Sequence, residues 1–194
     1  MIRIRHSRSS KPILAAVSVA LAAVAVTGCT SSSGSTANES ANQLVLNGLA
    51  AEKAGNVNQA FTDYMAAAAK DPHNKYAHYD LGYVYQQQGK VSNASSEYRK
   101  TLLIDPTFAA AVYNLGVLET PVDPATAISY FQQDLALEPN NASSNFDLGL
   151  LLIKQGETTE GYKFLETGLK LNPSLSTAVP PGVTVPSTTS TTIR

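Results

Sequence analysis

Apolar and small side chains recur at helical spacing through the middle of the chain. Leu81, Gly82 and Tyr85 fall on one face of a predicted helix. The helix that follows presents a similar face, formed by Ala94, Tyr98 and Thr101. Because small residues let two helices approach closely, the pattern predicts a packed antiparallel pair in which Gly82 makes room for the partner helix.

Helix-ending residues bound the predicted pair. Gly89 follows three glutamines, where a glycine takes the left-handed conformation that closes helices. Asp105 stands before a proline and is therefore pushed out of the helical region. Further on, Pro121 predicts the end of another helix, and Asp123 with Pro124 is typical of an N-cap followed by a first-turn proline.

Three columns of residues repeat at one period. They are a glycine column (Gly48, Gly82, Gly116, Gly149), a small-residue column (Ala60, Ala94, Ala127, Gly161) and a proline column (Pro72, Pro106, Pro139, Pro173). Every interval is 33 or 34 residues, which is the length of a helix-turn-helix repeat. Residues 41–175 are therefore predicted to form an all-α solenoid of about four repeats and eight helices.

This periodic region resembles the tetratricopeptide repeat family. The match is strongest in the second unit, with Asp80-Leu81-Gly82, Tyr85, Gly89, Ala94, Tyr98 and Asp105-Pro106, and in the fourth, with Asp147-Leu148-Gly149, Gly156, Leu165 and Asn172-Pro173. The resemblance divides the region into units at 41–74, 75–108, 109–141 and 142–175. It also implies a solenoid whose concave face is lined by the first helix of each unit.

The chain before the repeats has the pattern of an export signal. Basic residues precede an apolar run from residue 12 to residue 26, which is shorter than the ~20 residues of a membrane span. The run ends in Val-Thr-Gly-Cys, and Cys29 is the only cysteine, so this stretch resembles a bacterial lipobox. The resemblance implies a signal peptide over residues 1–28 and a diacylated Cys29, which is enough for stable membrane anchoring. The alternative is a cysteine that only happens to follow a signal sequence.

Low-complexity segments flank the repeats. Residues 29–40 contain the cysteine and a run of serine and threonine, which predicts a flexible spacer. Residues 176–194 are rich in proline, threonine and serine and are predicted to be disordered. We therefore expect an exported protein that is lipid-anchored to the cell membrane, on the outer face of the cytoplasmic membrane or at the periplasmic or outer membrane.

Charge and side-chain chemistry disfavour two other classes of function. Removing the leader takes away four of the 14 basic residues against 15 acidic ones, so the mature chain is acidic and nucleic acid is not an expected partner. No cluster of metal-ligating residues, phosphate loop or nucleophile elbow is present, and we expect no cofactor, metal or catalytic residue. His73 fits an inter-repeat turn and His78 a packing position. Asp80 and Asp147 lie two repeats apart, which disfavours a catalytic acid pair.

The family geometry implies which residues face the groove. The predicted ligand-binding residues are Tyr76, Tyr79, Asp80, Tyr83, Tyr113, Asn114, Phe146 and Asp147. Tyrosine combines an apolar face with a polar tip, as at binding hot spots, although each tyrosine could instead pack between repeats. The groove contains no basic residue. It therefore favours an extended or helical peptide with apolar side chains and a basic residue over a C-terminal carboxylate.

The expected function is that of a membrane-anchored adaptor or scaffold that binds a protein or peptide in the bacterial cell envelope. An alternative is a self-associating structural protein of the envelope. It would dock through the last predicted helix, residues 158–171, which contains Gly161 and Gly168 and which no further predicted helix covers. An enzyme with a site between repeats is the least favoured reading.

Overall fold

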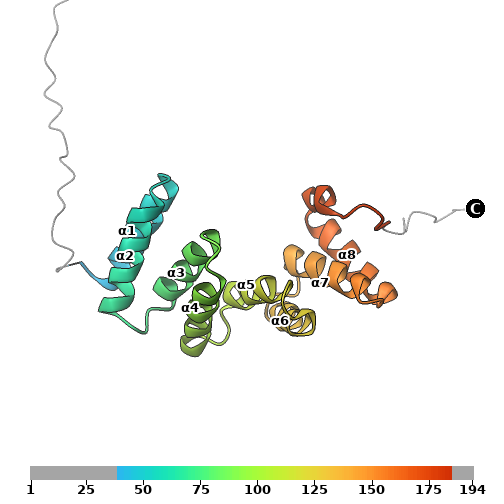
Figure 1. The fold of residues 1–194 in the computed structure, drawn as a ribbon, viewed down its shortest axis with the longest axis horizontal. Helices are drawn as coiled ribbons and strands as arrows, with labels where there is room; N and C mark the ends of the chain where they lie inside the picture. The colour runs from blue at the N-terminus through green and yellow to red at the C-terminus, as the bar shows by residue number, and fades with distance from the viewer. Residues whose placement is uncertain (1–38, 185–194) are drawn as a thin grey trace, which may run out of the picture. The chain divides into compact units, whose positions relative to one another are not determined.

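The computed structural model describes residues 39–184, which are helical in pairs (Figure 1). The helices are α1 (Ala41–Lys53), α2 (Val57–Lys70), α3 (Lys75–Gln87), α4 (Val91–Ile104), α5 (Ala109–Glu119), α6 (Pro124–Leu137), α7 (Ala142–Lys154), α8 (Thr158–Leu171) and the 3-10 helix η1 (Pro173–Ala178). This confirms the predicted all-α fold of eight successive helices. None of the helices is long and apolar enough to cross a membrane. The predicted signal peptide and Cys29 lie outside the described residues.

Short polar side chains begin five of the eight α-helices. Their oxygen atoms accept hydrogen bonds from backbone N–H groups of the first turn, at Ser40, Asn56, Asn74, Asp123 and Asn141. The predicted boundaries are present as well. Gly89 has a φ of 69° after α3, α4 ends before Asp105, and Pro124 is the first residue of α6.

In the first three hairpins, an aromatic ring fills the space beside a glycine. The ring of Tyr64 lies against Gly48, that of Tyr98 against Gly82 and that of Phe131 against Gly116. A methyl group added at Gly82 would lie 2.7 Å from the Tyr98 ring, which is buried and cannot move aside easily. The glycine inside α3 is therefore explained by the ring it accommodates, as its predicted role requires.

The fourth hairpin is packed more closely. A methyl group on Gly149 would lie 2.5 Å from the backbone nitrogen of Leu165 and 2.8 Å from the carbonyl oxygen of Gly161. At the other end, a methyl group on Gly168 would lie 2.7 Å from the backbone nitrogen of Phe146. The two glycines of α8 thus allow the backbones of α7 and α8 to touch.

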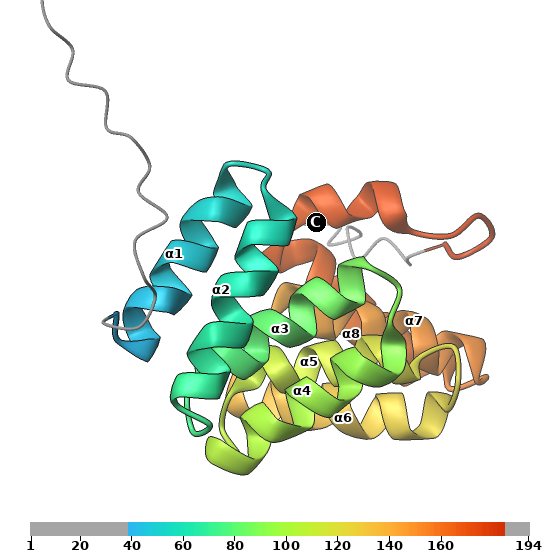
Figure 2. The ribbon, with the colours of Figure 1, turned by 60° about the vertical axis from the view of Figure 1, so that its left-hand side comes forward.

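Each hairpin also packs against the next one along the chain (Figure 2). Contacts between α2 and α3, α4 and α5, and α6 and α7 join the four hairpins. Three apolar clusters lie at these junctions, and their largest buried side chains include Leu81, Leu115 and Leu148. Since each hairpin buries its apolar face only with its neighbour's help, the four form one solenoid.

The residues after α8 differ from the sequence prediction. Residues 176–184 were placed in a disordered tail, but the structure shows η1 packed against α8 and then a turn that reaches Thr184. Pro180 and Val183 stand 34 residues after Phe146 and Gly149, so they occupy the register of a fifth repeat. Two successive prolines, Pro180 and Pro181, prevent a helix interior there, which explains why a turn replaces the next helix.

Candidate peptide-binding groove

The first helices of the hairpins form a groove that contains two pockets. The first pocket has a volume of about 530 Å³ and lies over α1, α3 and the start of α5. It is lined by Asn42, Val45, Leu46, Leu49, Tyr76, Tyr79, Asp80 and Phe108. Leu46, Leu49 and Tyr76 are 57%, 43% and 51% exposed, so the pocket presents apolar surface to solvent. Exposed apolar surface of this kind marks a binding site more often than isolated exposed leucines do.

Asp80 is the one carboxylate on the wall of the first pocket. Within residues 39–184, no hydrogen bond or ion pair to its side chain is present. Burial and, to a lesser extent, the nearby negative charge of Glu52 raise the pKa of its carboxyl group to about 7. A desolvated acid without a counter-charge is unusual in a structural role.

Aromatic rings form the rest of this pocket's floor and side. The ring of Tyr79 lies 5.0 Å from that of Phe108 and 5.7 Å from that of Tyr98, and Tyr76 meets Phe108 edge-on at 5.9 Å. The Lys75 ammonium lies 5.2 Å from the centre of the Tyr76 ring and pairs with Asp105 at 2.7 Å. These contacts hold the rings in place, and Tyr83 remains 37% exposed farther along α3.

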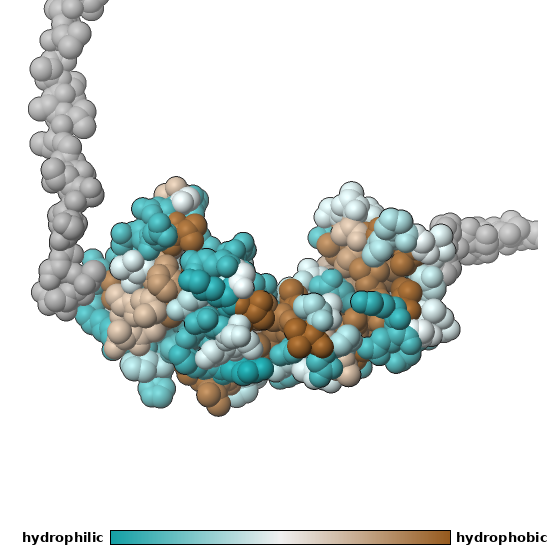
Figure 3. All heavy atoms as spheres, in the orientation of Figure 1, coloured by the Kyte–Doolittle hydropathy of each residue, from teal (hydrophilic) through white to brown (hydrophobic). Residues whose placement is uncertain are grey.

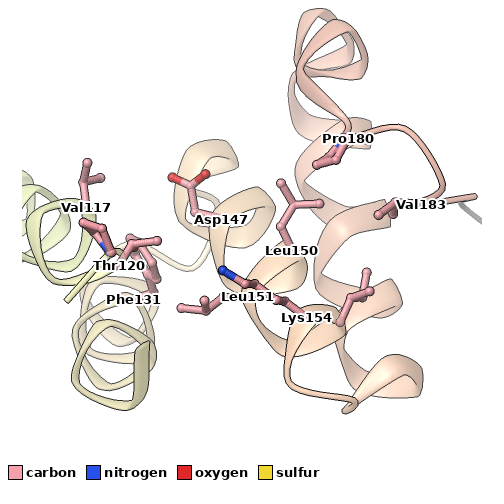
Figure 4. Close-up of a pocket in the computed structure, with 11 residues that line it drawn as sticks. Val117, Thr120, Phe131, Asp147, Leu150, Leu151, Lys154, Pro180 and Val183 are labelled. Carbon is pink, nitrogen blue, oxygen red and sulfur yellow. The ribbon is translucent and has the colours of Figure 1, made fainter. Parts of the chain in front are cut away.

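The second pocket lies over α5, α6 and α7 and also has a volume of about 530 Å³ (Figure 4). Its lining includes Val117, Thr120, Pro121, Phe131, Asp147, Leu150, Leu151, Ile153, Lys154, Pro180 and Val183. Figure 4 shows Pro180 and Val183 approaching α7 from the segment that follows η1. The turn after α8 therefore supplies one wall of this pocket.

Asp147 is the second pocket's counterpart of Asp80, but it has a partner. The hydroxyl of Tyr113 donates a hydrogen bond of 2.8 Å to its Oδ2 atom. Burial raises the pKa of Asp147, and the Tyr113 hydrogen bond opposes that rise. Between the two pockets, Asn114 Nδ2 donates to the Tyr79 hydroxyl at 3.4 Å. The two carboxylates occupy equivalent positions in different environments.

The space-filling view shows how polarity is distributed around these pockets. Hydrophobic surface gathers over α5 and α7 in Figure 3, with hydrophilic surface on both sides of it. Among the residues that the structure describes, no group of three or more His, Cys, Asp and Glu side chains could hold a metal ion. The groove is thus equipped to bind apolar groups.

Residues 51–116 and residues 142–175 each match the tetratricopeptide repeat family. Together these two matches cover just over half of the chain. The chain belongs to the tetratricopeptide repeat family. It is 34% identical over 74 residues to the photosystem I assembly protein Ycf3 of Acaryochloris marina (strain MBIC 11017). That alignment covers 37% of this chain and 45% of the relative, so the chain spans less than half of the length of the curated relative it matches.

Two solved structures have the same fold. A crystal structure of MamA has a TM-score of 0.62 and 18% identity, covering 71% of this chain and 81% of that one. The structure of YrrB, described as a tetratricopeptide repeat protein with an unusual peptide-binding site, has a TM-score of 0.62 and 21% identity. It covers 71% of this chain and 72% of YrrB. At these identities the likeness establishes the fold.

The tetratricopeptide geometry brings together only part of the predicted ligand-binding set. Tyr76, Tyr79 and Asp80 line the first pocket, and Asp147 lines the second. The other predicted residues lie beside the pockets or beneath them: Tyr83, Tyr113, Asn114 and Phe146. Phe146 is only 4% exposed, and its backbone lies close to Gly168 of α8. It lines neither pocket, so the pocket geometry does not support its predicted place among the ligand-binding residues.

Several pocket residues were not identified from the tetratricopeptide pattern. Phe108 precedes α5 and lies outside the columns, while Lys154 is at the end of α7. Pro180 and Val183 lie beyond the last matched repeat, and their 34-residue register was the signal that could have identified them.

The two histidines of the repeat region have structural partners or turn positions. His78 Nδ1 lies 2.7 Å from Glu97 Oε2 and its Nε2 lies 3.0 Å from the carbonyl oxygen of Pro72. His78 is 7% exposed, so these bonds satisfy a buried ring. The backbone N–H of His73 donates to Asp71 in the turn between α2 and α3. Neither ring lines the two pockets of the groove.

Proposed function

We propose that this tetratricopeptide repeat protein is a non-catalytic adaptor that binds a peptide segment of a partner protein in the groove. The observation that carries the proposal is the pair of pockets, each about 530 Å³, on consecutive first helices. An extended or helical peptide with apolar side chains and a basic residue would place one side chain in each pocket. The description of YrrB as a peptide-binding repeat protein, and of Ycf3 as an assembly protein, supports the same class of function.

The proposal places this adaptor at a membrane surface of the bacterial envelope, attached through lipid on Cys29. Its support is the basic leader, the short apolar run and the single cysteine at its end. Growth with an alkyne fatty acid should label the wild-type chain and leave the Cys29→Ser variant unlabelled and outside the membrane fraction. A wild-type chain that takes up no label would contradict the anchor.

Exposed side chains of the first pocket provide the test of the groove. A photo-reactive amino acid in place of Leu49 should form a cross-link to the partner in intact cells. The same amino acid in place of Leu103 is the matched control, because Leu103 is a leucine that is 84% exposed on α4 and lines a shallow site away from the groove.

The cross-linked partner is then identified and tested for binding with the Leu46→Asp/Leu49→Asp and Leu103→Asp variants. We expect the first variant to lose binding and the second to retain it, with both keeping the helical circular dichroism of the wild type. Equal binding by both variants would show that the partner docks elsewhere.

Self-association is the other candidate, and it would involve the fourth hairpin. The structure covers part of α8 with η1, and Glu157, Glu160 and Lys163 make its outer side polar, as a terminal repeat requires. We therefore favour a monomer that binds a different protein. A solution mass that doubles with concentration would reverse this preference.

A further inference from the structure

Asp80 differs from the other acidic groups along the groove because its carboxylate has no donor. The Tyr113 hydroxyl donates to Asp147, the Tyr64 hydroxyl donates to Glu52 at 2.9 Å, and Lys75 pairs with Asp105. Asp80 lies on the pocket wall beside exposed apolar side chains, and no described residue donates to it or pairs with it. A half-buried carboxylate that opens into a pocket, and that no described residue pairs with, points to a donor from outside.

The groups around Asp80 also leave its carboxylate without a cationic partner. The titratable groups that act on it from the helices packed against α3 are Glu52 of α1, Tyr64 of α2 and Tyr98 of α4. On α3 itself the titratable neighbour is Tyr79, and α5 contributes the neutral Asn114, which bonds to Tyr79. Lys75 of α3 also lies at the pocket's rings, but its ammonium pairs with Asp105 at 2.7 Å. Apart from Lys75, the groups around Asp80 are acids, phenols and an amide. A cationic ligand would therefore find attraction from several sides.

The remaining lining suits a long cationic side chain. Leu46 and Leu49 offer apolar surface for the methylene stem of a lysine or arginine, whose charged head can extend past them. Lys75 Nζ already lies 5.2 Å and 5.6 Å from the ring centres of Tyr76 and Phe108, so Asp80, and not these ring positions, is left for the charge of a ligand. A carboxylate at the end of an apolar and aromatic pocket is the arrangement that selects such a side chain.

We propose that the first pocket reads a lysine or arginine side chain of the bound peptide, with Asp80 as the acceptor of its charge. The second pocket takes an apolar side chain, because the Tyr113 hydroxyl already occupies Asp147. This inference rests on the proposed peptide-binding function and adds to it the chemical class of the ligand. It also predicts a linked proton: where the pocket holds Asp80 protonated, entry of the cation displaces that proton.

The test compares two fluorescein-labelled peptides that differ in one group. One is Gly-Leu-Leu-Arg-Leu-Leu-Gly, and the other has citrulline, a neutral isostere, in place of arginine. Fluorescence anisotropy with the full mature chain should give about tenfold tighter binding of the arginine peptide at pH 8. The ratio should fall at pH 6, because burial and Glu52 raise the pKa of Asp80 to about 7 and the carboxylate must lose its proton to pair.

Two variants assign this preference to its residue. Asp80→Asn should bind both peptides with the affinity that the wild type has for the citrulline peptide, at both pH values. Asp147→Asn is the matched control at the equivalent position two repeats away, and it should keep the arginine preference. If Asp80→Asn fails to fold, as judged by circular dichroism, the pH dependence of the wild-type ratio decides alone.

The outcomes separate this inference from the function on which it rests. Binding of both peptides with equal affinity by the wild type at pH 8 overturns the cation pocket and leaves the peptide groove standing. A preference that is lost in Asp147→Asn and kept in Asp80→Asn overturns the assignment to the first pocket. No binding of either peptide up to millimolar concentration overturns this inference and counts against the groove itself.

Discussion

The second and fourth hairpins are built on the same repeat pattern and pack in two different ways. In the second, the buried ring of Tyr98 lies between α3 and α4, and Gly82 makes room for it. In the fourth, Leu165 stands at the equivalent place, and the backbones of α7 and α8 meet directly at Gly149 and Gly161. One glycine column therefore serves two purposes: it accommodates an aromatic ring in one hairpin and a neighbouring backbone in the other.

The difference extends to the groove. In the fourth hairpin Phe146 is buried, whereas its counterpart Tyr79 in the second hairpin remains partly exposed and lines a pocket. In the second hairpin, the Tyr98 hydroxyl donates to Gln86 at 2.7 Å and its ring lies 5.7 Å from that of Tyr79. Equivalent positions of the first helix are thus exposed to different extents in the two hairpins.

The largest effect is expected from Gly149→Ala. Its new methyl group would meet the backbone of Leu165 at 2.5 Å, and backbone cannot rotate away as a side chain can. We expect the free energy of unfolding to fall by about 3 kcal/mol, the upper end of what overpacking costs, despite the better helix propensity of alanine. Urea unfolding followed by circular dichroism measures it. Shortening Leu165 to alanine should not rescue the variant, and a rescue would mean that the side chain was the obstacle.

A smaller loss, about 2 kcal/mol, is expected from Gly82→Ala, since its obstacle is the Tyr98 ring at 2.7 Å. Here the obstacle can be removed. In a double-mutant cycle, Tyr98→Leu should reduce the cost of Gly82→Ala by about 1 kcal/mol or more, because leucine stands at this place in the fourth hairpin. Independent, additive effects of the two changes would show that the hairpins do not differ as described.

Much of this fold could be predicted from the sequence because its determinants are local. The 33- and 34-residue period, Gly89 with φ of 69° and the N-cap at Asp123 each act within one hairpin or one turn. The role of Gly82 followed from the same logic, since a glycine inside a helix requires a close neighbour. The groove position of Asp80 came from the family geometry.

What could not be predicted depends on distances between helices. The close approach of α8 to the backbone of Phe146 at Gly168, and the 4% exposure of that residue, are not contained in the column pattern. The wall made by Pro180 and Val183 lies after the last recognisable repeat. The prolines there prevent a helix, but both residues keep the 34-residue register of the repeats. The missing donor to Asp80 is also invisible in sequence, because it depends on where Tyr64 and Asn114 direct their polar groups.

The smallest expected effect is the contribution of Asp80 in the second hairpin to the free energy of unfolding, compared with that of Asp147 in the fourth. The pKa of Asp80 is raised to about 7 in the folded chain, so the native state holds a proton that the unfolded state has lost above a pH of about 4. The stability from this group is therefore complete below pH 4 and disappears as the pH rises through 7. Asp80→Asn should remove this loss and raise the free energy of unfolding at pH 8, with little change at pH 4. A rise in pKa from about 4 to about 7 corresponds to about 4 kcal/mol, but solvent reaches the half-buried carboxylate, so we expect a gain of about 1 kcal/mol.

The control for that measurement is Asp147→Asn in the fourth hairpin. Burial raises the pKa of Asp147 too, but the Tyr113 hydroxyl donates to its carboxylate and opposes that rise, so Asp147→Asn should stabilise the fold at pH 8 less than Asp80→Asn does. Urea unfolding of both variants at pH 4 and pH 8 makes the comparison. A binding site that costs stability until its ligand arrives predicts the larger gain for Asp80→Asn. The same gain in both variants would make Asp80 an ordinary buried acid of the repeat.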